Sequence, residues 1–211
     1  GEKQLDPDIF TGRVDHSLTT NQKVFYSFNS TYVPRFRVDN PLPDPLTSGI
    51  IQVISSKMHR VGYDTIIRPN LLNSLILGVN RFRNPVDPVT AERGWPARLG
   101  LTGVTGDRFP VLSYGDGYVG AASGGITDNK DDVYMAKNTV NWTRGRSNWK
   151  FGGEYRWNHL HNRQLTNTQG ALTFSNLATS NPASPAGTGN SFASMLLGEV
   201  ASGNIRFPQN A

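Results

Sequence analysis

The stretch "SNWKFGGEYRWN", residues 147–158, alternates aromatic and charged side chains. Its aromatic side chains stand on every second position: Trp149, Phe151, Tyr155 and Trp157. Its charged side chains stand on positions between them: Lys150, Glu154 and Arg156. A period of two is typical of a β-strand, because successive side chains leave opposite faces of the pleat. The stretch therefore predicts a strand with one face against an apolar environment and the other against water.

The composition favours an all-β chain and excludes several classes of function. The 211 residues include 22 Gly and 13 Pro, which are typical of many turns and little helix. The net charge of +5 comes from scattered Lys and Arg residues, so we expect no nucleic-acid partner. The chain has no Cys, which excludes disulfides and thiolate metal sites.

Long strands recur along the chain in hairpins with short turns. The runs predicted as strands are 11–18, 22–33, 48–67, 71–84, 132–144 and 148–160. We predict an antiparallel meander in which the last two runs turn at Gly145 to Ser147 and bring Trp142 close to Trp149. The side chains predicted to form one apolar, aromatic face are Tyr26, Phe28, Tyr32, Trp142, Trp149, Phe151, Tyr155 and Trp157.

Three long loops are expected, at about 34–48, 85–131 and 176–190. Long loops at one end and short turns at the other are typical of outer-membrane barrels, whose strands need about 9 to 11 residues to cross. No segment has the roughly 20 consecutive apolar residues of a membrane helix, so strands would make any crossing. A soluble β-sandwich is the alternative, because it also has one apolar and one polar face.

No group of residues predicts catalysis or cofactor binding. His159 and His161 share one strand face, but no third metal ligand is near in sequence, so we expect no metal site. The acidic run "DNKDD" at 128–132 lacks the spacing of a calcium loop and is interpreted as a solvated turn. We therefore expect a protein that is not an enzyme.

One stretch, 191–200, has helical spacing of its apolar residues. These residues are Phe192, Met195, Leu196 and Val200. We predict one short helix near 190–198 that packs on the sheet. The alternative is a docking segment that covers a sheet edge or inserts into a neighbouring subunit.

Four segments together resemble the Oar-like TonB-dependent outer-membrane receptors, a group abundant in Acidobacteria. The segments are "RVDHSLTTNQKVFYSFN", "LLNSLILGVNRF", "WTRGRSNWKFGGEYRWN" and "GTGNSFASMLLGEV", in the family's order and over nearly the whole chain. The chain departs from the family pattern at Ser74, where Glu is usual, and at Ser147 and Ser194, where His and an acidic residue are common.

The resemblance implies a barrel segment of a receptor that imports large substrates. Family members resemble longer proteins with a carboxypeptidase-regulatory-like domain, a plug and a barrel of about 22 strands. The chain is expected to be a single barrel-type segment over 1–211, with roughly eight to ten strands and neither plug nor signal peptide.

A partial barrel has two open edges whose backbone groups need partners. In the first hypothesis the edges pair with the rest of the parent barrel, and the chain lies against lipid in the bacterial outer membrane. In the second, copies of the chain pair through these edges into a structural subunit of an extracellular filament or tube. The sequence predicts no particular substrate for either.

Overall fold

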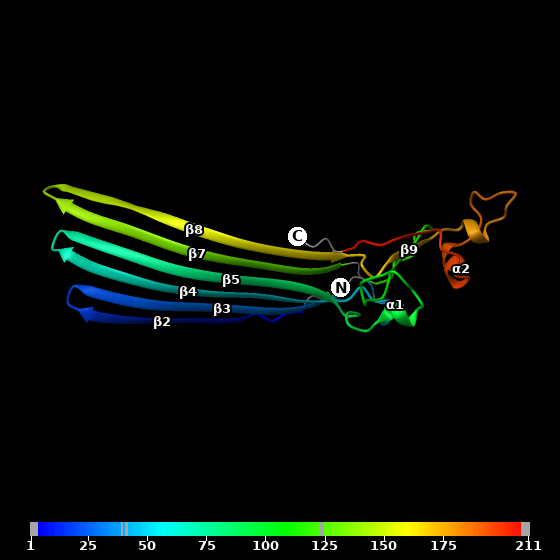
Figure 1. Cartoon of the computed structure of the whole chain (residues 1–211), viewed down its shortest axis with the longest axis horizontal. Helices are drawn as coiled ribbons and strands as arrows, with labels where there is room; N and C mark the ends of the chain where they lie inside the picture. The colour runs from blue at the N-terminus through cyan, green and yellow to red at the C-terminus, as the bar shows by residue number, and fades with distance from the viewer. Residues whose placement is uncertain (1–3, 39, 41, 123–124, 208–211) are drawn as a thin grey trace.

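A computed structural model describes residues 4–38, 40, 42–122 and 125–207, and one open antiparallel sheet dominates it (Figure 1). The sheet consists of β1 (Gln4–Leu5), β2 (Asp8–Thr19), β3 (Gln22–Arg37), β4 (Ile50–Arg68), β5 (Leu71–Pro88), β7 (Gly125–Arg144) and β8 (Ser147–Thr166). The neighbours run β3, β4, β5, β7, β8, while β1 and β2 both pair with β3. The predicted all-β fold and antiparallel meander are confirmed.

Three two-residue turns join the hairpins at one end of the sheet, at 20–21, 69–70 and 145–146. Gly145 has a φ of 62°, a left-handed conformation that glycine adopts without steric cost. The predicted pairing of 132–144 with 148–160 is confirmed, and Trp142 lies opposite Trp149 in its register.

Two strands run past the prolines at which loops were expected to begin. On the side of β3 that faces β1 and β2, Pro34 falls in the gap between the end of β2 and the start of β1. The missing N–H of Pro34 therefore interrupts no ladder on that side. Pro85 falls in a gap of the β4–β5 ladder between the pairs Gln52–Val86 and Ser55–Arg83. The loop boundaries expected at 34 and 85 therefore move to 38 and 89.

The acidic run at 128–132 lies inside β7, so its interpretation as a turn was wrong. It pairs with 81–85 of β5 on one side and with 159–163 of β8 on the other. Asp128, Lys130 and Asp132 share one face, where Lys130 Nζ lies 2.7 Å from Asp128 Oδ2, and Asp131 lies on the other face. This part of β7 lacks apolar side chains, which is why hydrophobic periodicity did not detect it.

Both outer strands of the sheet have an unpaired edge. Among the described residues, β2 pairs with β3 alone and β8 with β7 alone, so the sheet does not close. Nearly every side chain of β8 is exposed.

The long connections gather at the other end of the sheet into what we call the cap, the described residues of 38–49, 89–122 and 167–207 (Figure 1). Its elements are α1 (Trp95–Arg98), β6 (Val111–Tyr114), β9 (Ala171–Phe174), a 3₁₀ turn η1 (Leu177–Thr179), α2 (Ser191–Leu196) and β10 (Ser202–Asn204). Strands β10, β9 and β6 form a second, small sheet. The buried hydrophobic residues of the described chain all lie here: Phe109, Leu112, Ala121 and Phe174. The expected loop at 176–190 is part of this folded unit.

The predicted short helix is present as α2, which lies outside the long sheet. The prediction that it packs on the long sheet was wrong: α2 packs against η1 and β9 in the cap, with which it is continuous in sequence. Gly198, with a φ of 77°, follows the helix at its end.

Candidate functional surface: two faces of one sheet

The strand register places all the aromatic residues predicted to share a face on one side of the long sheet, which we call the aromatic face. Tyr134, which was not predicted, joins them and stacks on Trp157 with ring centroids 5.3 Å apart. Trp149 and Trp157 are each 57% exposed, and Tyr155 is 70% exposed. The sequence-predicted residues on this face are Tyr26, Phe28, Tyr32, Trp142, Trp149, Phe151, Tyr155 and Trp157.

An apolar band crosses the aromatic face near the short turns. On β5, β7 and β8 it spans 71–79, 134–142 and 149–157, about the length that crosses a bilayer. No Lys, Arg, Asp or Glu of these three ranges points to this face. Trp142 and Trp149 bound the band at the turn end, and Tyr134 and Trp157 bound it at the cap end, as aromatic girdles bound the apolar band of a membrane barrel.

Two amides inside the band satisfy each other. Asn73 Nδ2 donates to Asn138 Oδ1 at 2.9 Å, and Asn138 Nδ2 donates to Asn73 Oδ1 at 3.2 Å. This reciprocal pair joins β5 to β7 and lowers the cost of placing the two polar side chains in an apolar environment.

The opposite side of the sheet, the charged face, carries the residues that alternate with the band. Glu154 forms ion pairs with Arg156 on its own strand and with Lys137 on β7, the latter at 3.8 Å. At the other edge, Asp15 pairs with Arg13 at 2.8 Å and with Lys23 at 3.4 Å. The predicted separation of the β8 aromatics from Lys150, Glu154 and Arg156 follows from this register.

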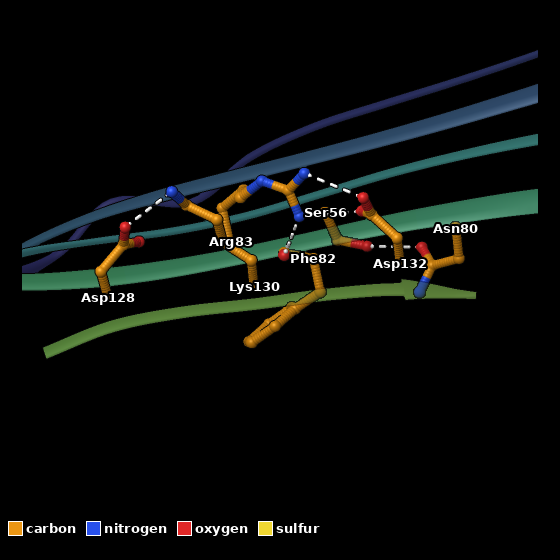
Figure 2. A network of polar contacts seen from close by, with 7 residues as sticks. All are labelled: Ser56, Asn80, Phe82, Arg83, Asp128, Lys130 and Asp132. Carbon is orange, nitrogen blue, oxygen red and sulfur yellow. Dashed lines mark hydrogen bonds and ion pairs between the residues drawn. The ribbon is translucent and has the colours of Figure 1, made fainter. Parts of the chain in front are cut away.

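Uncharged polar side chains link neighbouring strands across the charged face. Asn29 Nδ2 donates to Thr11 Oγ1 at 2.8 Å, between β3 and β2. Ser56 Oγ donates to Asn80 Oδ1 at 3.0 Å, between β4 and β5 (Figure 2). Such a surface suits contact with water.

Sequence reasoning missed a group of basic residues on the aromatic face, between the apolar band and the cap. We call it the cationic belt: Lys57, Arg81, Arg83, Lys130 and Arg163. Arg83 pairs with Asp132 at 2.8 Å, and Lys130 pairs with Asp128 (Figure 2). Strand parity could have revealed the belt, because on β8 Arg163 stands an even number of positions from Trp157.

The cap holds a buried arginine. Arg108 is fully buried, and its Nη2 donates to Gln169 Oε1 at 2.6 Å and to Thr168 Oγ1 at 3.0 Å. Burial lowers the pKa of Arg108, while the charges of Asp107 and Asp87 act in the opposite direction. The same Nη2 also reaches Leu165 O of β8 at 3.3 Å, so Arg108 ties the cap to the end of the sheet.

The four residues of the proposed docking segment separate in the structure. Met195 packs against the core of the cap, and the ring of Phe192 lies 5.9 Å from that of Tyr118. Leu196 is 70% exposed and Val200 is 46% exposed. Helix α2 buries Ser191 and Ser194 instead, so its exposed side is apolar.

The described residues contain no group of three or more His, Asp or Glu side chains arranged to hold a metal ion. His159 and His161 both lie on the aromatic face, opposite Asp132 and Lys130 respectively. None of the helices in the described part of the chain is long and apolar enough to span a membrane.

A comparison with protein families matches residues 2–211 to the outer membrane beta barrel domain. No curated protein and no solved structure matches the chain.

Proposed function

Because the chain belongs to the outer membrane beta barrel domain family, we propose that it forms part of the wall of an Oar-like, TonB-dependent transporter. The observation that carries the proposal is the contrast between the two faces of 149–157, where the aromatic face has no charge and the charged face has Lys150, Glu154 and Arg156. Lipid replaces a packed core on the first face, and the aqueous lumen hydrates the second.

The position of the cap gives the wall an orientation. In outer-membrane barrels the short turns face the periplasm and the long loops face the exterior. The turns at 20–21, 69–70 and 145–146 are then periplasmic, and the cap is extracellular (Figure 1). The cap has its own core, and in this orientation it would border the entrance through which a substrate passes.

The TonB-dependent part of the proposal rests on the four family-like segments. Three of them lie on the hairpin of β2 and β3, on β5, and on the hairpin of β7 and β8. The fourth contains α2 of the cap. In this proposal the chain catalyses no reaction and holds no cofactor, and transport energy comes from a partner in the inner membrane.

Site-directed spin labelling tests the wall, and these 211 residues contribute no Cys of their own. Single Cys residues are placed at successive positions of 149–156 in the full-length protein in outer-membrane vesicles. We expect labels at Phe151 and Tyr155 to collide mainly with oxygen, which dissolves in lipid, and labels at Lys150 and Glu154 to collide mainly with a water-soluble nickel chelate. Equal accessibility at all positions would contradict the proposal.

A second experiment tests the transporter type. Purified full-length protein is titrated with the periplasmic domain of TonB, and binding is measured by calorimetry. Saturable binding supports the TonB-dependent assignment, whereas no binding would leave a barrel of another transport class.

A second candidate function, self-assembly through strand edges, is favoured by the open edges of β2 and β8. Each edge has a row of unpaired backbone groups that could pair with another copy. Negative-stain images of the native material distinguish the candidates: detergent-bound particles support the membrane wall, and regular polymers support the filament or tube.

A further inference from the structure

We propose that the aromatic face binds an anionic, phosphate-bearing lipid of the outer leaflet, with its phosphate at the cationic belt and an acyl chain in a groove beside it. The inference rests on the proposed membrane wall and adds a ligand to its outer surface. Two independent features of the face carry it: a shallow apolar groove and, in the next row toward the cap, two cations, Lys57 and Arg81, that form no ion pair among the described residues.

The groove has a volume of about 450 Å³ and lies across β4, β5, β7 and β8. The β-sheet register gives it two adjacent rows of side chains. The first row is Val61, Leu77, Ala136 and Tyr155, and the second is His59, Val79, Tyr134 and Trp157. Its lining is almost wholly apolar, with small Ala136 between larger neighbours, so an extended hydrocarbon chain fits its chemistry.

The next row toward the cap is Lys57, Arg81, Asp132 and His159, and the row after it contains Arg83, Lys130 and His161. Polarity therefore changes completely within one register step beyond Trp157. In the proposed orientation this step lies at the head-group level of the outer leaflet.

Three cations of the belt, Lys57, Arg81 and Arg163, form no ion pair within the described part of the chain, although Arg81 lies opposite Asp132 and Arg163 lies opposite Asp128 in the strand register. Arg83 and Lys130 are engaged by Asp132 and Asp128 (Figure 2). Lys57 and Arg81 lie directly opposite each other on β4 and β5, and neither forms an ion pair within the described part of the chain. Like charges placed opposite each other across a ladder repel, so a bound anion between them removes an unfavourable interaction.

Charge complementarity selects the lipid class. The five Lys and Arg residues of the belt outnumber the two Asp residues beside them, Asp128 and Asp132, and the belt adjoins an apolar band that itself fits lipid. Basic clusters next to a membrane-embedded surface attract phosphate head groups. A zwitterionic lipid would satisfy the groove equally well and would gain much less from the belt.

Selective fluorescence quenching tests the site in the full-length protein. The protein is reconstituted in phosphatidylcholine vesicles that contain a small, fixed fraction of either phosphatidylglycerol or phosphatidylcholine with brominated acyl chains. We expect stronger quenching by the brominated phosphatidylglycerol. A Trp157→Phe variant should lose this excess, because Trp157 lines the groove, whereas Trp142 and Trp149 lie at the opposite border of the band.

Charge variants separate the belt from general attraction. Lys57→Gln combined with Arg81→Gln should lower the selectivity for the anionic lipid roughly 25-fold, at about fivefold per cation near an anionic surface. Lys150→Gln removes one cation from the charged face, and it should leave the selectivity unchanged. Equal loss in both variants would overturn the proposal.

Each remaining outcome is decisive. Absence of quenching by either brominated lipid would contradict the membrane wall itself. Equal quenching by both lipids in the unmodified protein would contradict only the anionic-lipid site. Loss of the excess on addition of millimolar inorganic phosphate would show that the belt recognises free phosphate, and would overturn the assignment to lipid.

Discussion

Phe174 of the cap is 4% exposed, whereas Tyr155 of the long sheet is 70% exposed. Both are aromatic residues of β-strands, but only the first has protein packed around it. The cap surrounds its apolar side chains with its own segments, so burial of apolar area contributes to its stability. The long sheet leaves its apolar side chains exposed, and in the proposed membrane wall lipid supplies the matching environment.

Polar groups show the same contrast. In the cap, Arg108 and Gln169 are fully buried and depend on hydrogen bonds within the protein. On the sheet, Lys150 and Arg156 remain exposed and rely on water. The two regions therefore respond differently to substitution, and the comparison can be tested from the largest expected effect to the smallest.

The largest effect is expected from Phe174→Ala, which creates a cavity in the core of the cap. Truncation of a buried Phe costs about 3–5 kcal/mol. Hydrogen exchange of the full-length protein in lipid should show lost protection in β6 and β9 and unchanged protection in β7. Leu177→Ala, at a side chain that is 65% exposed, is the control and should have little effect. Equal loss in β7 would mean that sheet and cap unfold together.

The next effect is expected from Leu75→Arg, which places a charge in the middle of the apolar band. An Arg at the bilayer midplane of a barrel costs about 2–4 kcal/mol. The free energy of folding into vesicles, measured by urea titration, gives the value. Ser74→Arg is the matched control on the charged face, opposite Asp64, and should change it by less than about 0.5 kcal/mol. A similar loss of folding free energy in the two variants would show that both faces of the sheet meet the same environment.

The smallest effect is expected from Asn190→Ala at the start of α2. Asn190 Oδ1 accepts the N–H of Ala193 at 2.9 Å, and loss of such a cap costs about 1 kcal/mol. Amide exchange of α2 should increase, while that of β9 should not change. Asn190→Asp keeps the accepting oxygen and loses the donation to Tyr118, so it should retain most of the helix protection. Equal exchange in both variants would assign the stability to the Tyr118 contact instead.

Much of the sheet could be predicted from single strands. The alternation around Trp149 and Phe151 predicts β8, and the turn at Gly145 predicts its partner. The predicted strands ended before Pro85 and began after Asp131, because a proline and a run of charged residues interrupt the alternation of apolar side chains there. Those strand ends are held by ladder pairs to neighbours that are remote in sequence, such as Thr127 with Val86.

The cap could not be predicted, because its contacts join separate segments. Asn40 Nδ2 donates to Gly120 O at 2.8 Å, and Ala122 N donates to Leu46 O at 2.9 Å. Apart from the helical spacing of 191–200, these segments are rich in Gly and Pro and lack periodicity. The small core around Leu112 exists only when all of them meet.

The sequence by itself determined the two-sided character of the sheet, since period-two patterning assigns each side chain of a strand to a face without any partner. Only the tertiary structure decided what lies beside what: the groove below Trp157, the pairing of Lys57 with Arg81, and the folding of the long connections into the cap. The physical reason is that facing is a property of one strand, whereas rows, grooves and small cores depend on register between strands and on contacts across the chain.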